Sequence, residues 1–388
     1  MRRVLLAAAL LAAPAAAQDR PADLTQVPAV PTDYTPERTA WGDWDLSATY
    51  QIEYFNAGRI LFQRPEEYGN RAWITDEEFA RRVAAAEKAD AAYSPEGQGI
   101  NYPGSQGLTD WIRTSSFGKR TSLIVSPANG QLPPMTSEGQ RLFENGRSGW
   151  VPGQEYDWVT DFDTWDRCIT RGYPASMLPN RYNNGIRVWQ APGYVVLQME
   201  MLALRVIPIG DTPPWPGNVE QWMGHSRAHW EGKTLVIETD HIKSGDAVSR
   251  DPNARSAPPV MVTVVGGAPL NTIPVSTRAR TVERLTRTSP DTLTYELTYD
   301  DPGVYTAPWT AQIEWVRDDG YQFYEYACHE GNHAIRGYIN SSRAKRRDLA
   351  AGTIQPETDD DRNRFIRPFD RDPALAPPPA PEAAGGGD

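Results

Sequence analysis

The stretch of sequence that decides the fold runs from Ser226 to Thr239 and reads SRAHWEGKTLVIET. Its two halves, Ser226–Trp230 and Thr234–Thr239, have the period-two alternation and the aromatic or β-branched residues of strands. They flank the short turn Glu231-Gly232-Lys233, which is the pattern of a β-hairpin. The same pattern predicts two further hairpins later in the chain. They join Thr281–Arg287 to Thr292–Tyr299, and Thr310–Val316 to Gln322–Tyr326.

Shorter strand-like runs precede this hairpin. Thr121–Val125 is the first of them. Arg187–Met201 and Leu204–Ile209 are predicted as a strand pair because Pro192-Gly193 and Gly210-Asp211 interrupt and end them. The sequence from residue 120 onward therefore predicts one strand after another, joined by turns.

Successive hairpins form a meander, and closing a meander into a barrel removes its exposed edges. We therefore expect a mainly all-β protein, a lipocalin-like antiparallel β-barrel with peripheral helices, with a β-sandwich as the alternative. One helix is predicted near 76–92, because Thr75 and Glu78 have the spacing of a capping box ahead of it. A second, short helix is expected around 136–145.

The first 17 residues are predicted to be a signal peptide. Arg2 and Arg3 form a basic start, Val4–Ala13 is apolar, and Ala15–Ala17 is a small-residue cleavage site before Gln18. The apolar run has about half of the roughly 20 residues that a membrane-spanning helix needs. We therefore expect a periplasmic or secreted protein of a Gram-negative bacterium, without membrane insertion.

The rest of the chain divides by composition. Residues 18–40, rich in Pro, Asp and Thr, are predicted to form an extended N-terminal arm, and residues 41–350 a single β-rich domain. Within that domain, residues 243–275 carry many Pro, Gly and small residues and are predicted to form a long loop or a lid. Residues 351–388 are expected to be a mostly disordered tail, since their composition cannot bury enough apolar surface to offset ordering.

The net charge and the cysteine content indicate which partners and which compartment to expect. Without Arg2 and Arg3, the 39 basic side chains of the chain become 37 against 50 acidic ones, a net charge of about −13. This balance excludes nucleic acid as an expected partner. Cys168 and Cys328 are the only 2 cysteines, and in an oxidising compartment they are predicted to form a disulfide. The oligomeric state is left open.

Several short motifs resemble those of a large family of exported Gram-negative proteins of unknown function. The resemblance extends over about residues 45–345 and implies export, but it implies no activity, cofactor or catalytic residue. The motifs are Arg167-Cys168-Ile169, Tyr182-Asn183-Asn184, Trp222-Met223-Gly224, the run Trp230-Glu231-Gly232-Lys233-Thr234-Leu235-Val236, and Tyr326-Ala327-Cys328-His329-Glu330-Gly331-Asn332.

A catalytic site is hypothesised around the expected disulfide. The bridge would bring Asp166, Arg167 and Arg171 close to His329 and Glu330. A histidine beside a carboxylate can act as a general acid or base near neutral pH, and an arginine can hold an anionic group. We expect a lyase, isomerase or hydrolase that needs no cofactor, or alternatively a salt-bridged network without catalysis.

The histidines offer a second, metal-binding alternative. Four of the 5 histidines fall in two pairs, His225 with His229 and His329 with His333. On a helix such a spacing places both imidazoles on one face, which suits zinc or copper. The pairs lie in strand and turn sequence instead, where positions four apart stand about 13 Å from each other. No metal ligand is therefore assigned.

Aromatic residues are abundant, with 13 Trp and 17 Tyr. Facing into a barrel, they would line a pocket for a small, largely apolar or aromatic ligand, whereas packed together they would form ordinary core. Glu200 and Arg205 interrupt apolar strand sequence and are candidates for the same pocket. A non-catalytic binding or envelope-interaction protein is the rival function. The predicted ligand-binding residues are Arg171, Tyr182, Asn183, Glu200, Arg205, Trp222, Trp230, Trp309 and Tyr326.

Overall fold

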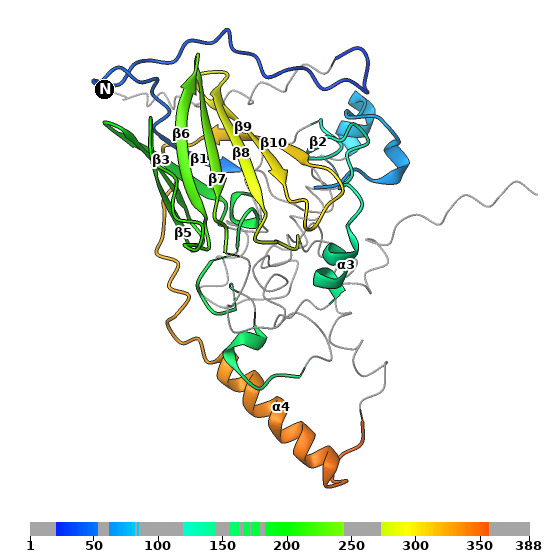
Figure 1. Ribbon diagram of the computed structural model, residues 1–388. Helices are drawn as coiled ribbons and strands as arrows, with labels where there is room; N and C mark the ends of the chain where they lie inside the picture. Colours follow the sequence, from blue (N-terminus) through cyan, green and yellow to red (C-terminus); the bar gives the residue numbers. More distant parts are fainter. Residues whose placement is uncertain are drawn as a thin grey trace, which may run out of the picture.

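The computed structural model places the strands around one barrel, from which a long C-terminal helix extends (Figure 1). The residues whose structure it describes are 21–52, 62–81, 84, 119–144, 155–162, 164, 166–170, 172–178, 183–243 and 273–356. The predicted signal peptide, most of the predicted lid (residues 244–272) and the tail beyond residue 356 lie outside them.

Ten strands form a single antiparallel sheet in the order β5-β4-β3-β1-β10-β9-β8-β7-β6, and β2 adds to β10 off this path. The strands are β1 (Ala48–Ile52), β2 (Ile124–Ser126), β3 (Gly185–Ala191), β4 (Tyr194–Met199), β5 (Ala203–Pro208), β6 (His225–Glu231), β7 (Thr234–Asp240), β8 (Arg280–Arg287), β9 (Thr292–Asp300) and β10 (Trp309–Arg317).

Nine of these strands curl into a nearly closed barrel, which confirms the expected all-β barrel. Its two end strands, β5 and β6, meet at a seam. There the connection is one short parallel bridge between Ile209 and Ala228, next to a 2.8 Å hydrogen bond from the Gly210 amide to the Ala228 carbonyl. The barrel is thus held by continuous ladders everywhere except at this seam.

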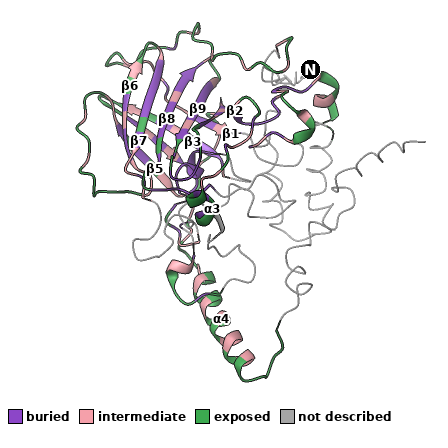
Figure 2. Cartoon of the chain, turned by 45° about the vertical axis from the view of Figure 1, so that its right-hand side comes forward, coloured by how far each residue is buried: buried purple, intermediate pink, exposed green. Residues whose placement is uncertain are grey.

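The alternation of residues along the strands determines which side chains are buried in the barrel. On β9 the inward side chains are Leu293, Tyr295, Leu297 and Tyr299, and all four are fully buried. The facing ring of Trp315 on β10 stacks on Tyr295 with 4.7 Å between the ring centroids. Each such side chain contributes about 1.5–3 kcal/mol by leaving water. Figure 2 shows burial concentrated on the barrel strands, so packed side chains fill this part of the interior.

Four of the predicted local structures are confirmed. The hairpins β6–β7 and β8–β9 have the predicted strands and turns, and α3 (Ser137–Glu144) is the short helix expected around 136–145. The helix at residue 76 begins with the predicted capping box, in which the Glu78 amide donates to Thr75 Oγ1 and the Thr75 amide to Glu78 Oε2. The described helical residues there are 76–81 and 84.

The third predicted hairpin is wrong. β10 forms as expected, but residues 322–326 are not a strand. The reason is that both edges of β10 are already occupied, by β9 on one side and by β1 with β2 on the other. The chain therefore leaves the sheet after Arg317, and Tyr321 turns instead to donate a 2.6 Å hydrogen bond to Glu200 Oε2.

The helix α4 (Ala334–Ala350) was not predicted from the sequence, and none of its residues is buried. It packs on the segment that contains the short helix η2 (Val159–Asp161). Tyr338 makes edge contacts with Tyr156 and Phe162, which stack on each other at 4.7 Å. Two other short 3₁₀ helices are η1 (Glu66–Tyr68) and η3 (Ala175–Met177). None of the helices in the described ranges is long and apolar enough to cross a bilayer.

Candidate functional site

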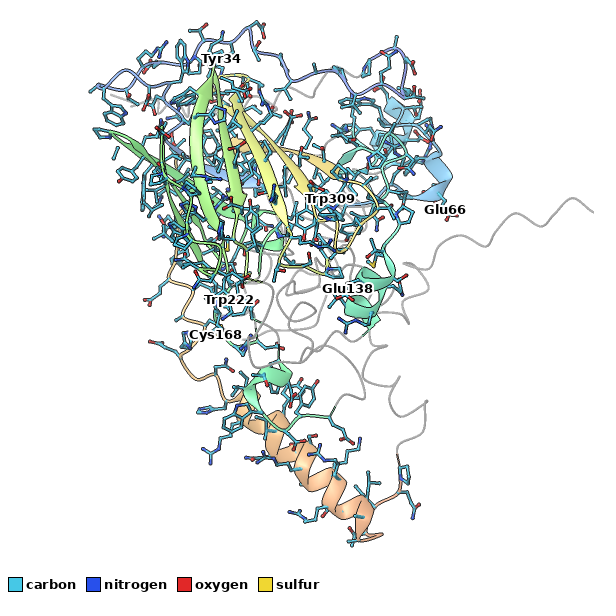
Figure 3. The ribbon with its side chains drawn as sticks, viewed as in Figure 1. Tyr34, Glu66, Glu138, Cys168, Trp222 and Trp309 are labelled. Carbon is cyan, nitrogen blue, oxygen red and sulfur yellow. A yellow bond between two sulfur atoms is a disulfide. The ribbon has the colours of Figure 1, made fainter. Side chains whose placement is uncertain are left out.

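The predicted disulfide is present. Cys168 and Cys328 are bonded, with 5.5 Å between their Cα atoms, and the bridge lies at the end of the barrel from which α4 extends (Figure 3). Asn332 strengthens the junction by donating from Nδ2 to the Asp166 carbonyl at 3.2 Å. The crosslink therefore joins the two segments that the sequence analysis paired.

The catalytic group predicted beside this bridge is assembled only in part. His329 and Glu330 follow Cys328 on a turn, and both are exposed. Arg167 is half-buried and lies over the Trp222 ring at 5.8 Å. Arg205, predicted as a ligand-binding residue of the barrel pocket, is buried inside the barrel. The inward face of β5 therefore carries Arg205 into the core and away from the exposed turn of His329 and Glu330.

Inside the barrel, Arg205 forms a buried ion pair with Glu283 of β8, at 2.6 Å between Nη2 and Glu283 Oε2. Tyr295 donates to Glu283 Oε1 at 2.7 Å, and Arg205 donates to the hydroxyls of Ser226 and Thr239. Burial disfavours the guanidinium charge, but the Glu283 carboxylate, together with Tyr173 and Tyr295, holds the pKa of Arg205 above its usual value. One Arg205 atom, Nε, is buried without a hydrogen-bond partner.

Glu200 is the other charged residue that interrupts apolar strand sequence. It is buried and accepts hydrogen bonds from the Gly185 amide at 3.1 Å and from the Tyr321 hydroxyl at 2.6 Å. Burial raises the pKa of its carboxyl above the ordinary 4.5, and the two hydrogen bonds oppose this shift. A side chain at Gly185 would lie 2.6 Å from the Tyr321 ring, so only glycine permits this approach.

The other predicted ligand-binding residues do not gather around one pocket. Trp309 is fully buried core, packed edge-on against Phe62, because β10 points it inward. Trp230 packs partly buried against the same core. Trp222 lies under two cations, Arg167 and Lys243. Tyr326 and Asn183 are half-buried, while Arg171 and Tyr182 fall outside the described residues.

A cavity of about 290 Å³ opens at the seam where β5 and β6 fail to close. Apolar side chains line much of it, and Arg205, His225 and Ser226 add polar atoms. The Trp215 ring, from the loop after β5, stacks on the His225 ring with 4.4 Å between centroids. The lining residues are Leu204, Arg205, Val206, Ile207, Pro208, Thr212, Trp215, Gln221, Met223, Gly224, His225 and Ser226.

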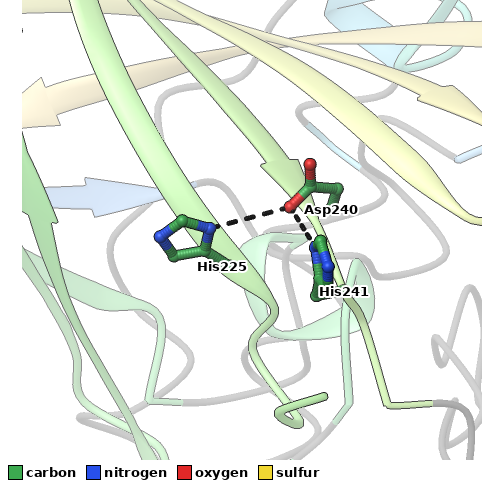
Figure 4. A group of neighbouring side chains, drawn as sticks. All are labelled: His225, Asp240 and His241. Carbon is green, nitrogen blue, oxygen red and sulfur yellow. Dashed lines mark hydrogen bonds and ion pairs between the residues drawn. The ribbon is translucent and has the colours of Figure 1, made fainter. Parts of the chain in front are cut away.

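His225 also belongs to a cluster with Asp240 and His241 (Figure 4). The β6–β7 register places His225 directly opposite Asp240. His241 follows in a left-handed backbone conformation, with φ 53°, and its Nδ1 lies 2.6 Å from Asp240 Oδ1. Burial, with the nearby Arg227 charge, lowers the pKa of His225 below its usual value, so its imidazole is neutral at neutral pH.

A second cavity, of about 450 Å³, lies beside this cluster. Asp240 and His241 line it together with Glu220, Arg278 and Asp300. The cluster therefore separates two cavities: His225 borders the one at the seam, and the other two members border the larger one.

The sequence analysis missed Asp240 and His241 and compared His225 with His229 instead. His225 and His229 do share the outer face of β6, but His229 is exposed and pairs with Glu231. The signal that identifies the cluster is the hairpin register. A turn at residues 231–233 pairs residue 225, where β6 begins, with residue 240, where β7 ends. His241 follows directly and therefore lies close to His225.

Comparisons with known proteins identified no relative of this chain. No family model matches the chain, and the searches of curated proteins and of solved structures returned no match. Any function must therefore be argued from the geometry.

Proposed function

We propose that this protein is an exported β-barrel that binds a small organic molecule, with an aromatic or apolar body and a hydrogen-bond acceptor, in the seam cavity. Export is supported by the basic and apolar N-terminal sequence and by the disulfide, which forms and persists in oxidising compartments. The cavity volume of about 290 Å³ is at the lower end for ligand pockets. The ligand is then about the size of one substituted aromatic ring.

The observation that carries the proposal is an unpaired donor on a residue that lines the cavity. Arg205 lines the cavity, and its Nε–H is buried with no acceptor. A buried donor without a partner costs about 1–3 kcal/mol, and a ligand oxygen would recover this. Because Glu283 already neutralises the guanidinium, that oxygen can belong to a neutral or an anionic group. Trp215 offers a ring face for the ligand's apolar body.

Titration of the protein labelled with 5-fluorotryptophan tests this proposal. Benzoate, phenylacetate and benzyl alcohol are the probes, and ¹⁹F NMR is the readout. We expect the resonance that is missing in Trp215→Phe to shift with at least one probe. Trp189 is the matched control, because it is an exposed tryptophan on the barrel surface, and its resonance should not move.

Substitution gives the same test a second readout. Trp215→Ala should weaken binding about tenfold, which corresponds to the roughly 1 kcal/mol of an aromatic contact, whereas Trp189→Ala should leave the affinity unchanged. Failure of all three probes to shift the Trp215 resonance, or equal effects of the two substitutions, would contradict a ligand site at the seam.

Catalysis at His329 and Glu330 remains the second candidate, as a lyase, isomerase or hydrolase. It is supported by the disulfide, which draws Asp166 toward that turn. The exposure of both side chains weakens it, because general acid–base groups work best when water is excluded. Turnover of an identified substrate that survives both His329→Ala and Glu330→Gln would remove it.

A further inference from the structure

The cluster of His225, Asp240 and His241 has the chemistry of a transition-metal site. Two imidazoles and one carboxylate are a common ligand set for zinc with three protein ligands. The three candidate ligand atoms all lie within 4.8 Å of one another. No other group of three or more His, Cys, Asp or Glu residues with this closeness occurs in the described part of the chain.

The distances fit a metal with short bonds. In a tetrahedral site with zinc–ligand bonds of about 2.0–2.1 Å, neighbouring ligand atoms stand roughly 3.3 Å apart. Asp240 Oδ1 lies 3.8 Å from His225 Nδ1 and 2.6 Å from His241 Nδ1. The two separations bracket the required value.

A second, independent observation points to a missing ligand. His225 is 6% exposed, and its Nδ1 is a buried atom without a hydrogen-bond partner. Buried polar atoms in native proteins are nearly always paired. The nearest acidic oxygen, Asp240 Oδ1, is too far for a hydrogen bond but well placed to share a metal with the imidazole.

The neighbours hold the three side chains in this arrangement. Arg227 donates to the other carboxylate oxygen, Asp240 Oδ2, at 2.9 Å, which leaves Oδ1 to face the histidines. Trp215 stacks on His225 and restricts its ring. The Gln221 amide donates to the His241 carbonyl at 3.0 Å and fixes the backbone there. Such outer contacts are typical of metal sites, where they orient the ligands.

We propose that His225, Asp240 and His241 bind one zinc ion. Three protein ligands leave a fourth coordination position for water or a small molecule. Asp240 and His241 also line the 450 Å³ cavity, which provides access to the ion. This site adjoins the seam cavity, which His225 also lines, but it binds a different ligand, since its ligand atoms belong to the outer face of the β6–β7 hairpin.

The test uses the full mature protein with its disulfide intact, stripped with EDTA and titrated with zinc against a chromophoric chelator. We expect one zinc per chain. Asp240→Asn and His241→Gln should each weaken binding at least about 100-fold. His229→Gln is the matched control, because His229 is an exposed histidine on the same strand as His225. It should bind zinc like the wild type.

Cobalt supplies a readout that does not depend on affinity. Co²⁺ bound to the wild type and to His229→Gln should give the intense visible absorption of a tetrahedral site, and this band should be missing in His241→Gln. Circular dichroism and thermal melting in EDTA test whether each variant is folded before its zinc binding is compared. If a variant is unfolded, His225→Asn is used in its place.

Three results would overturn the zinc site: no stoichiometric zinc on the wild type, wild-type affinity in both ligand variants, or equal loss in His229→Gln. None of these results bears on the seam ligand, whose ¹⁹F titration is carried out in EDTA.

Discussion

At the scale of single residues, the Arg205–Glu283 pair is the most demanding feature of the barrel, because it places two charges in the core. Their side chains are 2% and 0% exposed. Such a pair contributes little compared with apolar residues of similar size, but the loss of one partner leaves an uncompensated buried charge. The pair therefore determines which substitutions the barrel interior tolerates.

Glu283→Gln should lower the free energy of unfolding by about 3–5 kcal/mol, since Arg205 keeps its charge without a counter-ion. The double variant Arg205→Met/Glu283→Leu should lie closer to the wild type. Urea denaturation measures both. Glu231→Gln, which breaks the half-exposed pair with Arg284, is the matched control and should cost much less, because water screens an exposed ion pair. Equal losses in Glu283→Gln and Glu231→Gln would contradict this ranking.

The contribution of Glu200 to stability is predicted to depend on pH. Burial raises its folded-state pKa above 4.5, so between 4.5 and that raised pKa the folded state binds more protons than the unfolded state. The contribution of Glu200 to stability is therefore present at low pH and is lost as the pH rises through this window. In urea denaturation at pH 4.5–7.5, Glu200→Gln should remove this decline.

The half-buried Glu314, whose pKa is also raised by desolvation, keeps its own decline in both proteins. The difference between wild type and variant therefore isolates Glu200. Parallel curves for the two proteins would show that Glu200 does not titrate in this window.

At the scale of elements, the disulfide fastens the C-terminal segment rather than the barrel. Every barrel strand ends by Arg317, and only the residues after it depend on Cys328. The other contacts of α4 are half-exposed: the ion pairs of Arg343 and Arg346 with Asp157, and the packing of Tyr338. Exposed ion pairs add about 0–1 kcal/mol each.

The double variant Cys168→Ser/Cys328→Ser should therefore keep the β-sheet signal in circular dichroism and lose protection of residues 321–356. Limited proteolysis followed by mass spectrometry measures this. We expect the first cuts between Arg317 and Ala334, at least about tenfold faster than in the wild type. An unchanged cleavage rate, or loss of the sheet signal, would show that the bridge acts on a different part of the molecule.

At the scale of the whole molecule, the barrel is weakest between its two end strands, β5 and β6. β8 and β9 are hydrogen-bonded on both sides, whereas β5 and β6 have full ladders on one side only and meet through the Ile209–Ala228 bridge. Opening the seam breaks few hydrogen bonds, so it should occur without unfolding of the sheet. The 290 Å³ cavity also lies at this seam.

Hydrogen exchange measured by mass spectrometry should reveal this weak seam. Peptides that cover β5 and β6 should exchange roughly tenfold faster than those that cover β8 and β9. A ligand in the seam cavity should slow exchange in the first pair and leave the second unchanged. Uniform protection around the barrel would mean that the seam is as firmly closed as the other strand pairs.

The sequence by itself determined what depends on neighbours along the chain. Turn residues and period two predicted the β6–β7 and β8–β9 hairpins, a capping box predicted the helix at residue 76, and the count of two cysteines predicted their bridge. The hairpins and the capping box depend on residues close together in the chain, and two cysteines can form only one disulfide. The third hairpin failed because a strand-like pattern does not reveal whether its neighbour's edge is already occupied.

Only the tertiary structure decided which distant residues meet. It inserted β1 between β3 and β10, turned Arg205 toward Glu283, and left a seam lined by Trp215. It also brought His241 to His225, although 16 positions separate them in the chain. The physical reason is that register and closure are set by the summed packing of all nine barrel strands, and no short stretch of sequence contains that sum.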